Sequence, residues 1–571
     1  MKILKNIIFL VSAIIAVTSC NEEEFLNEVR LDGLDENNAY VTYDNFQSGL
    51  VKNYDLVRYY FYTQSGYPEY SYDHQYGTDL VHSGQHSAGT RVGDYAVYLN
   101  PTSGPVNWHW KTSYRIIANS NTILTRSKEA DLTDEQKTEI EAYARFFRGI
   151  GYRTLSYLYG GVPLVLDEVT EPKTDFVRAS RTDVYEAMIE DFSFAANNMP
   201  QKSEVKPGEV SQEVANFFLA EAYVANGQFS EAVQAATKTI NSSNVGLMYE
   251  RFGTRMSESG DVYWDLFRRG NQNLSENKEG LWVIQFELDQ PAGGLNSTSQ
   301  SGPLWERHHP PLFRDAKRMD NASVKAGFQW PTSDYTGGRG IGWMIPTYHF
   351  TNIIWQSDFD NDMRNSEYNF PRKFLFNNPN GADDLQGVIF DSETNPECVN
   401  SLATTGQWPR NLYPYQTKST TPGNHPDALY SNKETGLLLG AAGATYRDHY
   451  MLRLPEVYLI RAEAYLGMGQ PDKAAADLNV IRRRANASDV SVGDVDIDYI
   501  LDERMRELGI EEKRRLTLAR LGLVYDRTKK YNPYNADDIE SYNNLFPIPY
   551  GEIEKNPGAE LAQNPGYAAG E

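Results

Sequence analysis

The sequence predicts a mainly α-helical fold, in which a scaffold of tetratricopeptide-like helix pairs carries a large loop-rich insertion. The first observation is a pattern of thirteen residues near position 220 that recurs near position 462. The second is the centre of the chain, where helical periodicity fades and glycine, proline, asparagine and serine become frequent. The third is length: 571 residues exceed the about 250–300 at which single hydrophobic cores stop growing, so more than one lobe is expected.

Residues 1–19 form a predicted lipoprotein signal peptide. Lys2 and Lys5 precede an apolar stretch that is too short for a spanning helix of about 20 residues. The following Val17-Thr18-Ser19-Cys20 fits a lipobox, so Cys20 is the predicted lipidation site. The acidic run 21–24 resembles signals that send some Gram-negative lipoproteins to the outer face of the outer membrane. The alternative is an ordinary secretory peptide with an incidental cysteine.

The mature chain is acidic and needs acyl chains to reach a membrane. Without Lys2 and Lys5 it carries 52 basic and 77 acidic residues, a formal charge of −25. Such a surface repels nucleic acid and anionic lipid, so we expect no nucleic-acid partner and membrane contact through the lipid anchor only. Cys398 is the only other cysteine, so no disulfide is expected.

The repeated pattern predicts helix pairs. Residues 220–232 and 462–474 are identical at seven of thirteen positions. In each copy alanines allow close helix approach, and Gly227 or Gly469 ends the first helix. An array needs about three units to bury a continuous core, so divergent copies are expected, with 142–158 as the best candidate. Convergence of two ordinary alanine-rich helices is the alternative.

A further helix, rich in glutamate and arginine, is predicted over about 501–508. We expect its charges to pair three residues apart on a solvated face. The predicted pairs are Glu503 with Arg506 and Arg504 with Glu507.

Differences in helical periodicity and composition divide the mature chain into three regions. Residues 20–240 and 449–571 carry helical patterns, whereas 241–448 is the predicted loop-rich insertion and holds seven of the nine tryptophans. The other two, Trp108 and Trp110, lie in a similar loop-like stretch. Loops on a rigid scaffold are where binding residues concentrate, so we expect the ligand site among them.

Eight short blocks follow one another along the chain. They are Tyr114–Asn119, Ala144–Arg148, Gly160–Leu164, Tyr185–Asp191, Leu452–Ala464, Asp477–Arg482, Pro547–Pro549 and Gln563–Tyr567. In this order, behind a lipobox, they resemble the SusD/RagB family of outer-membrane lipoproteins. One departure is Glu512-Lys513-Arg514-Arg515, where the family often has Gly-x-Arg-Trp. This departure bears on local packing and not on the assignment.

The resemblance implies a SusD-like fold and a role in nutrient capture. Family members bind a nutrient, usually a glycan, and deliver it to a SusC-like TonB-dependent outer-membrane transporter. We therefore expect a cell-surface glycan-binding lipoprotein, lipid-anchored in the outer membrane and facing the exterior. A surface lipoprotein that binds peptide or another nutrient is the alternative. A tetratricopeptide-type protein–protein scaffold is the second alternative.

No enzyme, cofactor or metal site is expected. The chain lacks His-Glu-x-x-His, Gly-x-Ser-x-Gly and a phosphate loop. Gly338–Gly342 is glycine-rich but is interpreted as a turn, and His82 with His86 as loop histidines. Asp358-x-Asp360-x-Asp362 begins like a calcium loop, but the chain lacks the glycine and the bidentate glutamate that such a loop needs.

A sugar ring offers an apolar C–H face to an aromatic ring and a rim of hydroxyls to charged or amide groups. The predicted ligand-binding residues combine both kinds of group: Asp79, Arg91, Trp108, Trp110, Trp305, Trp330 and Trp343. We expect Trp110, Trp330 or Trp343 to stack on sugar. Asp79 and Arg91 are expected to hydrogen-bond hydroxyls. A place in the core is the alternative for each tryptophan taken singly.

Overall fold

The computed structural model describes residues 39–62, 70–85, 91–297, 302–316, 327–329, 333–379, 387–393 and 409–568. The predicted signal peptide, Cys20, His86 and Trp330 lie outside the described residues. In the part of the chain that is described, no helix combines the length and apolarity that crossing a membrane requires.

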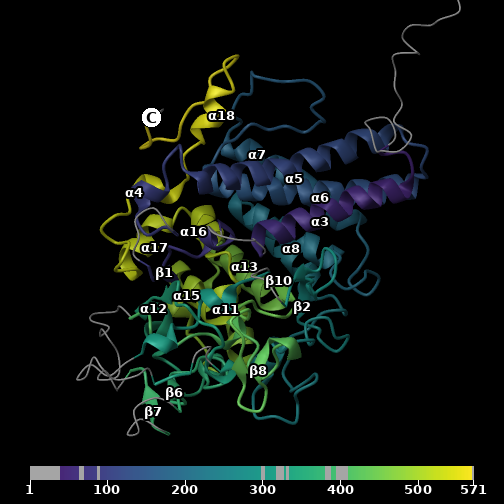
Figure 1. The fold of residues 1–571 in the computed structure, drawn as a ribbon. Coiled ribbons are helices and arrows are strands. Elements are labelled where there is room, and N and C mark those ends of the chain that lie inside the picture. The colour runs from purple at the N-terminus through teal and green to yellow at the C-terminus, as the bar shows by residue number, and fades with distance from the viewer. Residues whose placement is uncertain are drawn as a thin grey trace, which may run out of the picture.

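The scaffold is an array of α-helices that lie side by side, each packed against the next (Figure 1). In spatial order they are α3 (Tyr43–Phe61), α5 (Gly104–Glu129), α6 (Asp134–Tyr159), α7 (Arg181–Asn198), α8 (Gln212–Ala225), α9 (Phe229–Ile240), α13 (Leu454–Gly467), α14 (Pro471–Arg484) and α15 (Ile497–Glu507). Helix α9 is followed in space by α13, although the whole insertion lies between them in the sequence. The predicted mainly helical fold is confirmed.

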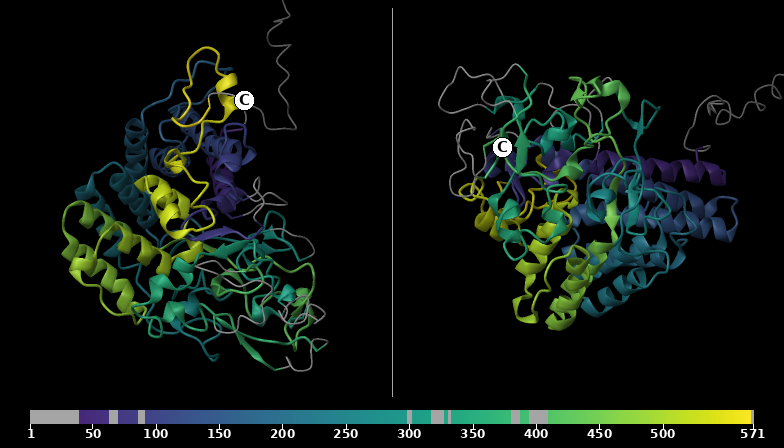
Figure 2. Two further views of the ribbon diagram at one scale, coloured as in Figure 1. Left: turned by 90° about the vertical axis from the view of Figure 1, so that its left-hand side faces the viewer. Right: turned by 90° about the horizontal axis from the view of Figure 1, so that it is seen from below.

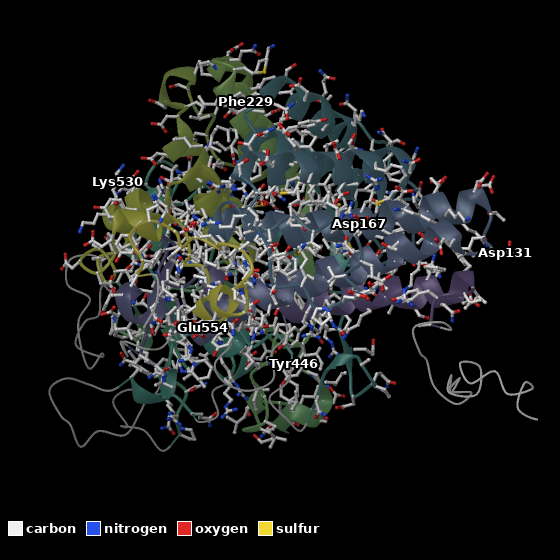
Figure 3. The ribbon with its side chains drawn as sticks, turned by 90° about the horizontal axis from the view of Figure 1, so that it is seen from above. Asp131, Asp167, Phe229, Tyr446, Lys530 and Glu554 are labelled. Carbon is white, nitrogen blue, oxygen red and sulfur yellow. The ribbon has the colours of Figure 1, made fainter. Side chains whose placement is uncertain are left out.

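Both copies of the repeated pattern fold as helix pairs, α8 with α9 and α13 with α14. Gly227 and Gly469 turn the chain between the helices with φ of +74° and +67°, a region that glycine adopts without steric cost. Where the two pairs meet, Gly467 of α13 lies directly beside the ring of Phe229 of α9. Phe229 is labelled in Figure 3. Both predicted helix pairs are therefore present in the structure, and they pack on each other.

The prediction that Trp108 and Trp110 lie in a loop is wrong. Helix α5 begins at Gly104 with Pro105 in its first turn, so it includes both tryptophans. Proline favours this position because its φ suits a helix and its missing N–H would have no intrahelical partner there. The helix therefore includes the stretch that is predicted to be a loop.

The insertion leaves the scaffold after α9 and returns at α13, and Figure 2 shows it as short elements joined by loops on one side of the helices. Its elements are α10 (Val262–Leu266), β2 (Gly280–Ile284), β3 (Glu287–Leu288), β4 (Gly294–Leu295), α11 (Trp305–His308), β5 (Met344–Pro346), α12 (Tyr348–Thr351), β6 (Lys373–Leu375), β7 (Ile389–Asp391), β8 (Tyr430–Asn432), β9 (Leu437–Leu438) and β10 (His449–Arg453).

The described strands form two-stranded sheets: β10 pairs with β2, β6 with β7 and β8 with β9, all antiparallel, while β3 pairs with β4 in parallel. The fifth pair joins the insertion to the N-terminal region, because β1 (Val81–Ser83) runs antiparallel to β5 with Val81 opposite Pro346.

The remaining elements are short helices of the N-terminal region, the insertion and the C-terminal region. The helices are α4 (Tyr95–Tyr98), α16 (Arg514–Leu521), α17 (Val524–Tyr531) and α18 (Tyr550–Glu554). The 3-10 helices are η1 (Tyr70–His74), η2 (Phe313–Asp315), η3 (Asp334–Thr336), η4 (Ile353–Trp355), η5 (Met363–Asn365), η8 (Thr417–Ser419), η9 (Asp427–Leu429), η10 (Val492–Asp494), η11 (Gly509–Glu511) and η12 (Ser541–Asn544). Helix α16 packs against both α6 and η1, so the C-terminal region contacts η1 in the N-terminal region directly.

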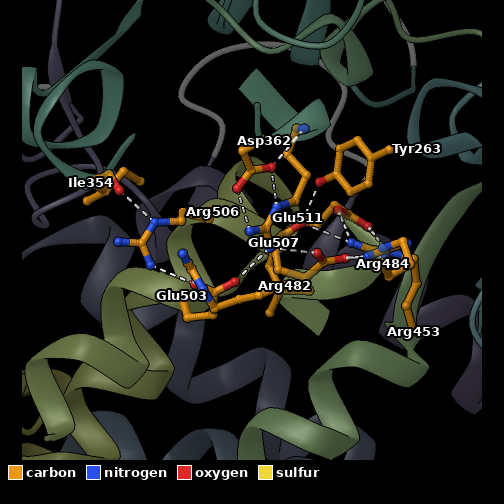
Figure 4. Close-up of polar contacts among 12 residues, drawn as sticks. Tyr263, Ile354, Asp362, Arg453, Arg482, Arg484, Glu503, Arg506, Glu507 and Glu511 are labelled. Carbon is orange, nitrogen blue, oxygen red and sulfur yellow. Dashed lines mark hydrogen bonds and ion pairs between the residues drawn. The ribbon is translucent and has the colours of Figure 1, made fainter. Parts of the chain in front are cut away.

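A buried network of ion pairs joins α15 to the insertion (Figure 4). Glu507 accepts hydrogen bonds from Arg364, Arg453 and Arg484, and all four side chains are fully buried. Burial alone would raise the pKa of Glu507, but the three guanidinium groups lower it well below its ordinary value. Removing one member would leave an uncompensated buried charge, which makes the network costly to interrupt.

The same network corrects the expected solvated face of α15. The predicted pair of Glu503 with Arg506 is present at 2.6 Å, but both side chains are buried. Arg504 does not pair with Glu507; it donates to Glu512 at 2.5 Å instead. A charge-rich helix pattern cannot distinguish a solvated face from one that is covered by oppositely charged groups of other segments.

Candidate functional site

Several of the predicted site residues gather around η1, whose side chains reach both the scaffold and the insertion. The ring of Tyr70 lies 5.8 Å from that of Trp108 on α5. Tyr72 stacks on His308 of α11 at 3.8 Å. We name this region the η1 junction, formed by Tyr59, Tyr70, Tyr72, Arg91, Trp108, His308 and Trp343.

On the insertion side, the structure brings Arg91 and Trp343 together. The guanidinium carbon of Arg91 lies 4.6 Å from the centre of the Trp343 ring, a cation–π contact. Trp343 in turn meets His308 edge-on at 5.0 Å. Arg91 holds a φ of +50°, a strained conformation for a residue other than glycine. These contacts fix Arg91 against the insertion.

Trp305 lies beside the junction but in the core. It is 2% exposed and packs edge-on against His449 at 4.6 Å. Its ring centre is also 6.1 Å from that of Tyr62, the C-cap residue of α3. A ligand cannot stack on a ring enclosed in this way, so we assign Trp305 a packing role.

On the scaffold side, the junction presents aromatic surface to solvent. Trp108 lies parallel to Tyr60 at 5.0 Å, with an angle of 8° between the rings. Its indole N–H donates to the hydroxyl of Tyr59 at 3.3 Å. Trp108, Tyr59 and Tyr70 are all half-buried, so these three rings are available to a ligand. The arrangement can take the C–H face of a sugar ring.

A buried chain of hydrogen bonds supports this surface from below. The hydroxyl of Tyr60 lies 2.6 Å from Nδ1 of His109, and Nε2 of His109 lies 3.2 Å from Asp73. Tyr98 donates to the other oxygen of Asp73 at 2.6 Å. Burial, followed by the charge of Asp73, raises the pKa of Tyr60 well above its ordinary value, so this hydroxyl stays protonated. The chain fixes the ring on which Trp108 rests.

The structure does not bring Asp79 to the junction surface. Asp79 is fully buried, and its carboxylate accepts from Arg514 at 2.6 and 2.8 Å and from Arg527 at 2.8 Å. Burial would raise its pKa, but the two arginines lower it well below the ordinary value. A ligand could reach this carboxylate only by displacing an arginine. We therefore replace the predicted hydroxyl-binding role of Asp79 with a structural one.

Trp110 lies apart from the junction, although it is only two positions from Trp108. It is 4% exposed and lines a separate cavity of about 380 Å³ between α5, the segment 163–176 and the segment 552–561. Successive helical residues are about 100° apart, so Trp108 and Trp110 point to opposite sides of α5. The predicted tryptophans thus do not form one site.

Sequence reasoning missed Tyr59, Tyr70, Tyr72 and His308. One signal was available: between positions 70 and 76 every second residue is tyrosine or histidine. Such a run places aromatic rings on more than one side of a short helix. Here it allows η1 to contact both the scaffold and the insertion.

Two aspartates of the run that begins like a calcium loop bind serine and arginine side chains of the protein. Asp358 accepts from Ser488 at 2.6 Å and from Arg482 at 2.7 Å, and Asp362 pairs with Arg364 at 2.6 Å. Among the residues that the structure describes, no group of three or more histidine, cysteine, aspartate or glutamate side chains is placed to hold a metal ion.

Two family models match the chain. Residues 402–567 match the model of the SusD family. Residues 36–224 match a second model, described as starch-binding and associating with the outer membrane. The second model covers the scaffold from α3 to nearly the end of α8, and the first covers the end of the insertion and the scaffold helices α13 to α15 with the segments that follow them.

Curated relatives and solved structures agree with the models. SusD-like protein P2 of Formosa agariphila is 23% identical over 513 residues, 86% of each chain. The starch-binding protein SusD of Bacteroides thetaiotaomicron is 37% identical over 132 residues, 22% of this chain and 23% of that one. Surface glycan-binding protein A of B. thetaiotaomicron, solved with laminarihexaose, shares the fold with a TM-score of 0.63 and 19% identity over 91% of this chain and 99% of that one. With these matches and the fold on which they lie, the chain belongs to the SusD/RagB family.

Proposed function

We propose that this protein is a surface lipoprotein that captures an oligosaccharide or polysaccharide at the η1 junction. The observation that carries the proposal is the half-buried aromatic surface of Tyr59, Tyr70 and Trp108, held by the buried hydrogen-bond chain beneath it. The relatives supply the ligand class, since one is named as starch-binding and another was solved with laminarihexaose. In this proposed role the protein binds the glycan and does not catalyse a reaction on it.

The junction also offers hydrogen-bonding groups at the edges of its aromatic surface. The hydroxyl of Tyr59 accepts from Trp108 and can still donate its own proton. The hydroxyl of Tyr70 has no hydrogen-bond partner among the residues that the structure describes, so it can both donate and accept. A sugar ring seated on Trp108 would find both hydroxyls at its rim. Arg91 lies on the insertion side, where it is fixed by Trp343.

The proposed place of action is the exterior face of the outer membrane. The lipobox at Cys20 and the acidic run behind it support a lipid anchor there. One of the matching family models is described as associating with the outer membrane. By resemblance, the partner is a SusC-like TonB-dependent transporter, which would receive the captured glycan.

The ligand can be tested directly with the purified mature chain. We expect isothermal titration calorimetry to detect at least one member of a panel of malto-oligosaccharides, laminarihexaose and other polysaccharide fragments. Trp108→Ala should weaken that binding about tenfold or more, because an aromatic platform contributes roughly 1–3 kcal/mol per stacked ring. Because Trp108 also packs on Tyr60, the variant should lose some stability, so thermal unfolding is measured to choose a temperature at which it is fully folded for the titration.

Tyr249→Ala is the matched control, because Tyr249 is 63% exposed and has no part in the junction. Unchanged affinity in both Trp108→Ala and Tyr70→Ala would place the ligand elsewhere. A chain that binds peptides and none of the glycans would favour the nearest alternative, a peptide-binding lipoprotein. The partnership is tested by co-purification in mild detergents, where migration of the anchored protein alone would count against a transporter partner.

A further inference from the structure

The cavity beside Trp110 is built from three segments that are distant in the sequence. Helix α5 supplies one side, the segment 163–176 a second, and the C-terminal segment around α18 a third. Its volume of about 380 Å³ lies within the range of small-molecule sites, about 300–1,000 Å³. Figure 3 shows Asp167, one of the lining residues, on the face seen from above.

The floor of the cavity is aromatic and already in place. The rings of Trp110 and Tyr114 are 5.1 Å apart, and Phe176 lines the cavity with them. Tyr114 is fixed because its hydroxyl donates to the backbone carbonyl of Pro163 at 2.7 Å. Trp110 is fixed edge-on against Tyr159 at 5.1 Å. A ligand would therefore meet a rigid surface, which lowers the entropic cost of binding.

The walls are held by amides whose hydrogen bonds are satisfied within the protein. Asn121 donates to the carbonyl of Val165 at 2.9 Å and accepts from Arg148 at 3.0 Å. Asn556 accepts from the backbone N–H of Phe176 at 2.7 Å and donates to its carbonyl at 2.8 Å. These bonds tie the two loop segments to each other and to the scaffold, so the cavity keeps its shape without a ligand.

Three other polar groups of the lining have no hydrogen-bond or ion-pair partner among the described residues. The indole N–H of Trp110, the hydroxyl of Thr122 and the carboxylate of Asp167 make no hydrogen bond or ion pair with any residue in the described ranges. Two exposed lysines at the rim form ion pairs of 3.0 Å: Lys173 with exposed Asp175, and Lys555 with Glu552, a half-buried residue of the lining. Such exposed pairs are weak and can exchange partners.

This combination selects among the possible ligands. An aliphatic side chain or an acyl chain would cover the aromatic floor but would leave the Trp110 N–H and the Thr122 hydroxyl without partners, at a free-energy cost. A small anion would gain nothing from the aromatic floor and would face the Asp167 carboxylate. A neutral sugar satisfies both kinds of surface, with its C–H face on the rings and its hydroxyls toward the polar groups.

We propose that this cavity is a second saccharide site, which takes one or two neutral pyranose rings behind α5. Trp110 and Tyr114 form its platform, and Asp167, Thr122 and the Trp110 N–H bind hydroxyls. The site extends the proposed function from one binding surface to two. Because Trp108 and Trp110 point to opposite sides of the same helix, each site can be altered without touching the other.

The test uses the full mature chain and saturation-transfer NMR with methyl glycosides of glucose, galactose, mannose, xylose and N-acetylglucosamine. Trp110 is too deeply buried to be replaced safely, so the cavity is filled instead with Ala118→Trp, since Ala118 is an exposed lining residue of α5. Lys111→Trp is the control, because Lys111 is exposed on α5 and does not line the cavity. We expect at least one glycoside to bind, and Ala118→Trp to abolish that signal while Lys111→Trp retains it.

A second pair of variants tests the hydrogen-bonding role. Asp167→Asn should weaken binding of the same glycoside about tenfold, whereas Asp131→Asn, at the far tip of the scaffold in Figure 3, should not change it. A signal that survives Ala118→Trp but is lost in Trp108→Ala belongs to the η1 junction and overturns the second site. A cavity that binds the apolar dye anilinonaphthalene sulfonate and no glycoside also overturns it. Loss of oligosaccharide binding in Trp108→Ala alone leaves the proposed function standing without the second site.

Discussion

Asp79 and Arg514 lie 435 positions apart and form a doubly hydrogen-bonded ion pair in which both side chains are fully buried. Arg514 belongs to the run Glu512–Arg515, the one block that departs from the family pattern. Its neighbour Arg515 donates to the backbone carbonyls of Asp73 and Tyr76 at 2.9 and 2.6 Å. The run therefore holds the chain from η1 to β1 in place, and the departure lies where the junction is supported.

The first prediction concerns this pair. Asp79→Asn removes the carboxylate that Arg514 and Arg527 share, but Arg514 keeps Glu512, and Arg527 keeps Asp498 and Asp502. The charges stay partly compensated, so the substitution should lower the free energy of unfolding by about 1–3 kcal/mol. Urea denaturation measures this change. Asp427→Asn is the matched control, because Asp427 pairs with Lys433 at an exposed position and its loss should have no measurable effect. Unchanged unfolding together with lost glycan affinity would show that Asp79 contacts ligand after all.

The second prediction concerns a buried histidine of the insertion. Nε2 of His425 lies 2.6 Å from Glu306, and Nδ1 lies 3.6 Å from Asp334. Burial lowers the pKa of His425, but the two carboxylates raise it to about 9. Since the folded pKa exceeds the ordinary value, the charged imidazole stabilises the fold fully below pH about 6.5, and this contribution is lost as the pH rises through about 9.

His425→Gln removes the titration. The difference in unfolding free energy between the native chain and this variant should fall by about 3 kcal/mol between pH 6 and 9.5. His74→Gln provides the contrasting control, because burial holds the pKa of folded His74 well below its ordinary value. Its difference should not fall but rise by less than about 1 kcal/mol, as the unfolded chain loses its proton near pH 6.5. Urea titrations at several pH values measure both differences. A difference for His425→Gln that is independent of pH would contradict a charged His425.

The sequence predicted what is encoded locally and missed what depends on long-range pairing. The helix pairs around Gly227 and Gly469 could be predicted because helical periodicity and a turn glycine are signals within a few residues. The contact of Arg91 with Trp343 could not, because it depends on the pairing of β1 with β5, whose register no local pattern contains. The ion pair of Asp79 with Arg514 could not be predicted either, because only the fold brings these two distant residues together.

The third prediction tests how α13 packs on α9. A Cβ atom at Gly467 would lie 2.7 Å from the ring of Phe229, so Gly467→Ala must displace that ring. We expect a loss of about 1–3 kcal/mol in the free energy of unfolding. Phe229→Leu in the same chain should recover part of it, and a double-mutant cycle measures the coupling.

Gly469→Ala is the control for this cycle. Gly469 has a φ of +67° but no atom within 4 Å of its Cβ position, so its substitution strains the backbone without touching α9. Its cost should therefore be the same with phenylalanine or leucine at position 229. A Gly467→Ala effect that is likewise independent of residue 229 would contradict the packing of the two helix pairs through this contact.

The last prediction concerns the anchor and its side of the membrane. Cys20→Ala removes the acylated thiol, and since each buried methylene contributes about 0.8 kcal/mol to membrane binding, the unacylated chain should leave the membrane fraction. Substitution of Glu22, Glu23 and Glu24 by alanine keeps the lipobox and removes only the acidic run. This second variant should stay in the membrane fraction, but protease added to intact cells should no longer degrade it, whereas the native chain is degraded. A native chain that resists protease on intact cells would lie in the periplasm, and surface capture of a polysaccharide would then be excluded, because a large polymer could not reach the η1 junction before transport.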